Sequence, residues 1–316
     1  MNIEKIFDYA RENNISDIHL LEGEKIYFRK DGEIIEYDGT DTVSKEELLE
    51  ICNGKIEEDF SYTDSKSQRY RVNSFLTRGK LALVIRIINK EPIKLKGKFI
   101  NKVIDEKILS LKDGLVLVTG ITGSGKSTTL ANIIEKFNEN KNLKILAIED
   151  PIEYIFENKK SLIIQRELGK DVESFEKALK SSLRQDPDVI ILGEIRDEES
   201  LYSALKLAET GHLVFSTLHT MNTVESVNRL ISMVRSEKKD FIREQLASIL
   251  RFILSQELHR GKKTVPIFEI LNNTKAVANL ILNNKLNQIP TLIESGIENF
   301  MITKTKYLKN IETESD

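Results

Sequence analysis

Residues 120–127 constrain the fold of this chain more than any other stretch, because they read Gly-Ile-Thr-Gly-Ser-Gly-Lys-Ser and have the spacing G-x-x-x-x-G-K-S. The run before them, 115–118, is continuously apolar, as in a strand buried on both faces. After them, apolar residues recur at helical spacing from Leu130 to Phe137. This order predicts a phosphate-binding loop. A chance glycine-rich turn followed by Lys-Ser is the alternative, which the flanking strand and helix disfavour.

Each part of this loop has an expected role in binding a nucleoside triphosphate. The glycines let backbone N–H groups turn toward phosphate oxygens at a helix N-terminus, whose dipole favours an anion. Lys126 can reach the β- and γ-phosphates and the Ser127 hydroxyl can bind Mg²⁺, so the expected cofactors are ATP and Mg²⁺. The residues expected to bind the nucleotide are Gly120, Thr122, Gly123, Ser124, Gly125, Lys126, Ser127 and Thr128.

Composition narrows the class of protein. A length of 316 residues favours two domains, and 47 Lys+Arg against 50 Asp+Glu give a net charge of −3, so nucleic acid is a disfavoured partner. The single cysteine, Cys52, excludes an intramolecular disulfide and a cysteine-built zinc site, which fits a reducing cytoplasm. No run reaches the ~18 apolar residues of a membrane span. We therefore expect a cytoplasmic protein without direct membrane insertion, which acts at a membrane only through a partner.

The first 93 residues predict a small α+β domain. Its expected elements are a helix over 2–13, a strand over 15–20, a hairpin of 25–29 and 33–37 around Asp31-Gly32, a helix opened by the capping box of Ser44 and Glu47, and a hairpin of 69–76 and 81–88. Residues 91–97 are lysine-rich and break the pattern, which predicts the domain linker there.

Residues 94–316 predict a larger α/β domain. Apolar strands alternate with helical stretches, which implies a mostly parallel sheet with helices on both faces. The expected strands are 115–118, 144–148, 162–164, 189–192 and 213–217. Past Ile231 the chain predicts helices broken by one strand near 265–271, and then a frayed polar tail over 309–316.

Polar side chains gather where these strands end, as ligand groups do in parallel sheets. Glu194 follows one apolar strand and is expected near Mg²⁺, while Glu149 ends another and is the better candidate to polarise the attacking water. His212 and His219 bracket the strand over 213–217, where a histidine can sense the γ-phosphate. The acids could instead be helix N-caps or solvated loop residues, and the histidines could be core or capping residues.

Four long stretches resemble the signature boxes of the secretion and type IV pilus motor ATPases. They are the Walker A, Asp, Walker B and His boxes, at 119–130, 148–154, 183–197 and 208–220. The resemblance extends to 15–20 and 69–75, which are similar to the family's PAS-like N-terminal domain. It implies a RecA-like P-loop NTPase core (94–316, with a C-terminal helical region), a PAS-like N-terminal domain (1–93) and assembly into a homohexamer.

Within that family the segment 165–171 is similar to the PilT-type retraction motors, which act in twitching motility. The resemblance implies Glu149 as catalytic base, Glu194 at Mg²⁺ with Ser127, and His219 or His212 as sensor of the γ-phosphate. It also implies that Arg71 and Arg86 reach the phosphates, although as strand arginines they would otherwise be solvated surface residues. The implied partner is a pilus platform protein at the inner face of the cell membrane.

One departure leaves the direction of work open. PilT-type proteins carry Ala-Ile-Arg-Asn-Leu-Ile-Arg-Glu near the C-terminus, whereas residues 276–283 here read Ala-Val-Ala-Asn-Leu-Ile-Leu-Asn. The charged groups are replaced by Ala278, Leu282 and Asn283, on what is either an exposed helix face or a face packed on the core. A pilus assembly or type II secretion ATPase is therefore the alternative. A nucleic-acid translocase and a nucleotide switch that does not hydrolyse are the remoter ones.

Overall fold

The computed structural model describes residues 3–30, 32–39, 42–66, 68–88, 92–260 and 264–314, and its chain forms two compact units. The first unit consists of Met1–Glu91 with Pro151–Ile155, and the second of Pro92–Asp150 with Phe156–Asp316. Residues 151–155, which the sequence assigns to the second domain, therefore pack with the first unit. Among the described residues, no helix has both the length and the apolar character needed to cross a membrane.

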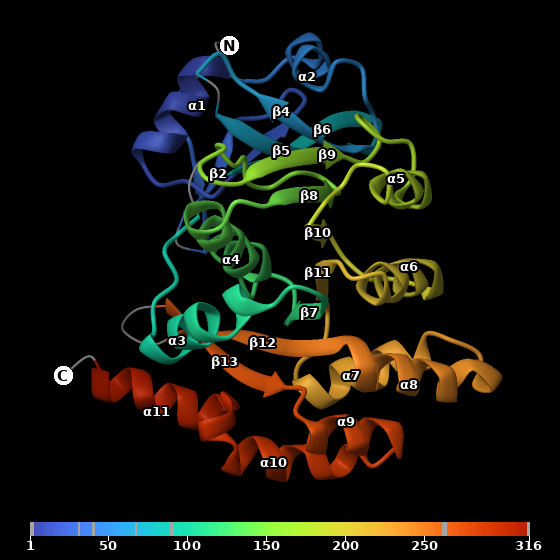
Figure 1. The fold of residues 1–316 in the computed structure, drawn as a ribbon. Helices are drawn as coiled ribbons and strands as arrows, with labels where there is room; N and C mark the ends of the chain where they lie inside the picture. The colour runs from blue at the N-terminus through green and yellow to red at the C-terminus, as the bar shows by residue number, and fades with distance from the viewer. Residues whose placement is uncertain are drawn as a thin grey trace. The chain divides into compact units, whose positions relative to one another are not determined.

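The first unit is a six-stranded antiparallel sheet with both of its helices on one face (Figure 1). The strand order is β3-β2-β1-β6-β5-β4. The strands are β1 (Asp17–Leu21), β2 (Tyr27–Lys30), β3 (Glu33–Glu36), β4 (Asp59–Thr63), β5 (Arg69–Thr77) and β6 (Lys80–Ile87), and the helices are α1 (Ile3–Glu12) and α2 (Lys45–Cys52). The predicted capping box at Ser44 and Glu47 is confirmed. The strand β4 was not predicted, and Asp31 of the first hairpin lies outside the described residues.

A buried carboxylate ties α1 to the sheet of the first unit. Asp64 accepts hydrogen bonds from the Tyr70 hydroxyl at 2.9 Å and the Gln68 backbone N–H at 2.8 Å, and it forms an ion pair with Arg11. Burial alone would raise the pKa of this carboxyl, but these hydrogen bonds outweigh burial and leave the pKa below its ordinary value. Burial and the same carboxylate raise the pKa of Tyr70.

The second unit contains a seven-stranded sheet in the order β13-β12-β7-β11-β10-β8-β9 (Figure 1). All neighbouring pairs are parallel except β12 and β13, so β13 is an antiparallel edge strand. The strands are β7 (Gly114–Thr119), β8 (Lys144–Glu149), β9 (Leu162–Glu167), β10 (Val189–Leu192), β11 (Leu213–Leu218), β12 (Leu250–Arg260) and β13 (Thr264–Asn272). The predicted α/β architecture is thus confirmed for this unit.

Helices cover both faces of this sheet. One face packs against α3 (Lys98–Glu106), α4 (Lys126–Asn140) and α11 (Lys304–Glu314). The other packs against α5 (Phe175–Ser182), α6 (Glu198–Glu209), α7 (Thr223–Ser232) and α8 (Lys239–Ile249), and the same core extends to α9 (Lys275–Leu282) and α10 (Ile289–Ser295). Because both faces are covered, the central strands β7, β10 and β11 are wholly buried, which explains their continuous apolar runs.

Two predictions about the C-terminal part are wrong. Residues 250–260 form the strand β12 between β7 and β13, where helix was expected. Residues 309–314 of the expected frayed tail are instead the end of α11, and residues 315 and 316 lie outside the described residues. In both places tertiary packing decides the structure: β12 completes the ladder beside β7, and Tyr307 of α11 is buried against the sheet core.

Candidate nucleotide site

The loop 120–125 joins the end of β7 to the N-terminus of α4, as the sequence predicts. Gly125 is the N-cap residue of α4 and has no side chain to cap it, so the first N–H groups of this 15-residue helix are available to an anion. Lys126 is 9% exposed, and its Nζ donates to the carbonyl oxygens of Gly120 at 2.8 Å and Ile121 at 3.2 Å. This places the ammonium group inside the turn of the loop, where a phosphate chain would meet it.

The loop fits a phosphate group. A Cβ at Gly123 would meet no atom within 4 Å, so this part of the loop is open. The Ser124 hydroxyl is buried and has no hydrogen-bond partner among the described residues, and it points toward Gly120, where a Cβ would lie 2.4 Å from it. A buried hydroxyl without a partner is a donor that a bound phosphate oxygen would satisfy.

Magnesium fits only together with a nucleotide. Ser127, in the first turn of α4, offers a hydroxyl and Glu194 offers a carboxylate. In the described part of the chain no group of three or more His, Cys, Asp or Glu side chains could hold a metal ion alone. Such a sparse donor set suits Mg²⁺, which keeps several waters and is normally bound by one or two protein groups plus phosphates.

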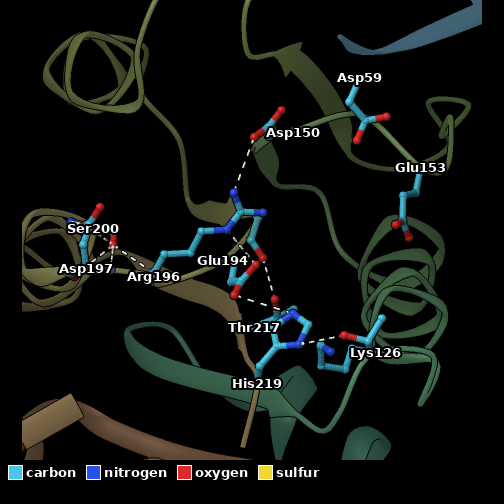
Figure 2. Close-up of polar contacts among 12 residues, drawn as sticks. Asp59, Lys126, Asp150, Glu153, Glu194, Arg196, Asp197, Ser200, Thr217 and His219 are labelled. Carbon is cyan, nitrogen blue, oxygen red and sulfur yellow. Dashed lines mark hydrogen bonds and ion pairs between the residues drawn. The ribbon is translucent and has the colours of Figure 1, made fainter. Parts of the chain in front are cut away.

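Glu194 lies in a polar cluster that joins three of the predicted boxes (Figure 2). Its Oε1 is 3.5 Å from His219 Nε2, and its Oε2 accepts a hydrogen bond of 2.9 Å from Arg196 Nε. On its other side, His219 Nδ1 is 3.4 Å from the Thr122 hydroxyl of the phosphate loop. His219 therefore bridges the loop and the carboxylate, which is the position of a group that can respond to the γ-phosphate.

Glu149 is the last residue of β8, and its carboxylate is oriented from β9. Gln165 Nε2 donates to Glu149 Oε1 at 3.0 Å, while Gln165 Oε1 accepts from the Phe156 N–H at 3.0 Å. Because both ends of the amide are used, the side chain of Gln165 has one orientation and presents a donor to Glu149. The neighbouring strand thus fixes Glu149 Oε1 at the end of β8.

A cleft of about 340 Å³ borders this cluster in the second unit. It is lined by Glu194, Ile195, Arg196, Leu218, His219, Thr220, Glu225 and Arg229. The cleft therefore gives the carboxylate of Glu194 and the imidazole of His219 access to solvent on the side of α7.

His212 is a predicted site residue that lies at the other end of β11 from the phosphate loop. It precedes β11, whose first residue Leu213 pairs with Gly114 at the start of β7, whereas the phosphate loop follows the other end of β7. His212 Nδ1 is 3.0 Å from the Thr210 hydroxyl and 3.1 Å from the Leu207 carbonyl, so it caps the end of α6. A strand of this length separates it from the loop by roughly 20 Å, which corrects the alternative that His212 senses the γ-phosphate.

Arg71 and Arg86 lie directly opposite each other on β5 and β6 of the first unit. Like charges in this position repel, and each arginine is paired with a carboxylate: Arg71 with Asp59 and Arg86 with Asp17, the latter at 2.8 Å. Arg86 keeps 64% of its side chain exposed. The two guanidinium groups are thus held on the sheet face opposite the helices, and contact with a phosphate remains a prediction.

Sequence reasoning missed one residue of the loop's surroundings, Gln256 on β12. It is 3% exposed, and its amide contacts both the phosphate loop and α4. The available signal was a polar residue within the apolar stretch around 250–258. A helix over that stretch gives no reason to place this residue beside the phosphate loop.

Comparison with known proteins gives consistent matches along the chain. A family profile described as "Type II/IV secretion system protein" matches residues 1–284. A "twitching motility protein" of Neisseria gonorrhoeae is 42% identical over 273 residues, which cover 85% of this chain and 73% of the relative. The type IV pilus retraction ATPase PilT of Pseudomonas aeruginosa is 36% identical over 324 residues, covering 98% of this chain and 94% of the relative.

A solved structure matches as well. The crystal structure of the pilus retraction motor PilT with bound ADP has a TM-score of 0.85 and 36% sequence identity, covering 99% of this chain and 94% of that chain. A match of this extent bears out the predicted fold class.

Proposed function

Because this chain belongs to the type II/IV secretion system protein family, we propose that it is a PilT-like ATPase that converts ATP hydrolysis into force on a type IV pilus. It works as a homohexamer at the cytoplasmic face of the membrane, through a platform protein of the pilus. The observation that carries the proposal is the cluster at one edge of the parallel sheet, where Lys126, Glu194 and His219 converge on the phosphate loop.

The chain's residues divide the chemistry among themselves. The loop N–H groups and Lys126 hold the β- and γ-phosphates, and Ser127 with Glu194 holds Mg²⁺, which supplies charge neutralisation for the phosphates when it is bound. Glu149 accepts the proton of the attacking water, while Gln165 holds the carboxylate in place. His219, between Thr122 and Glu194, registers whether a γ-phosphate is present.

Arg71 and Arg86 supply cations for the charge that develops on the γ-phosphoryl group. Their adjacent placement on β5 and β6 supports this role, because the sheet fixes both backbones while Arg86 stays largely exposed. Without a nucleotide, Asp59 and Asp17 hold the two side chains in place.

The direction of work is retraction in this proposal, with a platform contact that differs from that of other PilT-type motors. Leu282 is 48% exposed and Asn283 is exposed, so the face of α9 that lacks the usual charges is a surface. The alternative that Leu282 is packed in the core is wrong. Neutral side chains on this surface select a partner differently from two arginines and a glutamate. An assembly motor is the second candidate because of this change.

Two experiments test the proposal. Glu149→Gln should retain ADP binding and lose at least about 100-fold in ATP turnover, because it removes the base but leaves the loop intact, whereas Lys126→Ala should weaken nucleotide binding itself. Near-normal turnover of Glu149→Gln would move the role of base to Glu194.

Deleting the gene tests the direction. Cells without it should carry more surface pili and show no twitching, measured by pilus shearing and by motility at an agar surface. Cells that lose their pili instead would identify an assembly motor. DNA- or RNA-stimulated turnover by the purified protein would favour the translocase.

A further inference from the structure

The middle of β12 reaches both nucleotide-site loops of the second unit. Ser255 pairs with Thr119, the last residue of β7 before the phosphate loop. Because successive strand residues point to opposite faces, Ser255 and Gln256 project to opposite sides. The Ser255 hydroxyl donates to the Met221 carbonyl at 3.1 Å, just after His219, whereas Gln256 faces the phosphate loop and α4.

Gln256 uses both ends of its amide. Its Nε2 donates to the Ser124 carbonyl at 2.5 Å, and its Oε1 accepts from the Thr129 hydroxyl at 2.6 Å. All three residues are at most 3% exposed, so both hydrogen bonds are shielded from water. The amide therefore links the phosphate loop to the first turns of α4 from a strand that carries none of the four signature boxes.

The bond to Ser124 orients a peptide group. In a trans peptide the C=O and the following N–H point in opposite directions, so holding the Ser124 carbonyl toward β12 turns the Gly125 N–H away from β12. That N–H belongs to the loop expected to surround the phosphate.

Gly125 leaves the room that this contact needs. Its φ is +86°, and a Cβ at this position would lie 2.9 Å from Gln256 Nε2. A Cβ at Gly120 would lie 2.4 Å from the backbone carbonyl oxygen of Gln256. Two glycines of the loop thus permit the close approach of β12 as well as the turn itself.

We propose that Gln256 is a positioning residue that holds the phosphate loop in its nucleotide-binding conformation and so sets the affinity for nucleotide. It acts through Ser124 and Thr129 and touches no reacting atom. This inference rests on the proposed nucleotide site but assigns a role to a residue outside the signature boxes.

The test replaces Gln256 with methionine, which has a similar length and no hydrogen-bonding amide. The full-length protein is titrated with a fluorescent ADP analogue, and steady-state ATP turnover gives KM and kcat. We expect Kd for ADP and KM for ATP to rise together by about 10-fold, because one buried hydrogen bond to the loop and one to α4 are lost. We expect kcat to stay within about threefold. Thr129→Val, which removes only the hydrogen bond between Gln256 and α4, should give a smaller rise in Kd.

Asn138→Leu is the matched control. Asn138 is a fully buried amide in the last turn of the same helix, and it donates to the Glu157 carbonyl at 2.8 Å, far from the loop. It should lower the melting temperature as Gln256→Met does but leave Kd unchanged. If Gln256→Met binds ADP within twofold of the unmodified protein, or loses kcat with KM unchanged, the inference is wrong. Failure of the unmodified protein to bind ADP would instead contradict the proposed function.

Discussion

At the scale of single residues, the buried carboxylate of Asp64 serves stability and not catalysis. Asp64 has no known part in the nucleotide site, yet it joins Arg11 of α1 to Tyr70 of β5 and accepts two backbone N–H groups, from Lys66 and Gln68. Asp105 is a carboxylate at the surface, because it is 53% exposed and forms an ion pair with Lys136.

Asp64→Asn should therefore lower the free energy of unfolding by about 3 kcal/mol at pH 7, since it leaves Arg11 without its buried partner. The folded-state pKa of Asp64 is below the ordinary value, so its contribution is complete above a pH of about 4 and is lost as the pH falls through that lower pKa. The difference between the variant and the unmodified protein should shrink accordingly in acid. Urea unfolding at pH 7 and below pH 4 measures it.

Asp105→Asn is the control for this comparison, and it should cost less than about 1 kcal/mol because its ion pair is solvated. Equal losses for the two variants would contradict the role of Asp64.

At the scale of elements, the sequence predicts those that local pattern determines. The strands at 189–192 and 213–217, buried on both faces, and the capping box at Ser44 follow directly from composition and spacing. The strand β12 does not, because Leu250–Arg260 has no turn signals and is held as a strand by its two neighbours. Because β12 is missed, Gln256 is missed too. His212 precedes β11, so the rule that ligand groups gather at the carboxyl ends of parallel strands already favours His219 over His212.

The helix α9 gives the prediction at this scale. A triple variant that restores the usual charges, Ala278→Arg, Leu282→Arg and Asn283→Glu, should leave ATP turnover within about twofold. The reason is that Leu282 and Asn283 are exposed and Val277 and Ile281 carry the packing. It should change twitching speed, because the altered surface meets a partner.

The control for α9 is Lys275→Gln, which changes an exposed charge in the first turn of the same helix. A triple variant that twitches at the unmodified rate, or one that loses turnover, would contradict a partner-binding role for this surface.

At the scale of the whole molecule, the proposed mechanism requires both units for hydrolysis. The phosphate loop and its acids belong to the second unit, and Arg71 and Arg86 belong to the first. Neither unit contains the complete set of charges expected around a γ-phosphoryl group.

The double variant Arg71→Gln and Arg86→Gln should therefore lose at least about 10-fold in kcat while its affinity for ADP stays within about threefold, because the arginines act on charge that develops during hydrolysis. Turnover assays and ADP titration on the full-length protein measure the two effects. Lys80→Gln, on the same sheet and paired with Glu24 at the surface, is the control and should behave like the unmodified protein. Unchanged kcat in the double variant would remove the first unit from the chemistry.

The short segment Pro151–Ile155 has a consequence for how the protein can be taken apart. It belongs to the first unit, where Arg69 donates to the Ile152 carbonyl at 3.1 Å. In the sequence, however, it lies between two stretches of the second unit. The polypeptide thus passes from one unit to the other three times, at 91/92, 150/151 and 155/156. A tryptic nick after Lys94 or Lys96 would yield two fragments on a denaturing gel that still elute as one species from a gel-filtration column. The crossings at 150/151 and 155/156 both lie within the larger fragment. That fragment therefore keeps residues 151–155, which are a piece of the smaller fragment's fold.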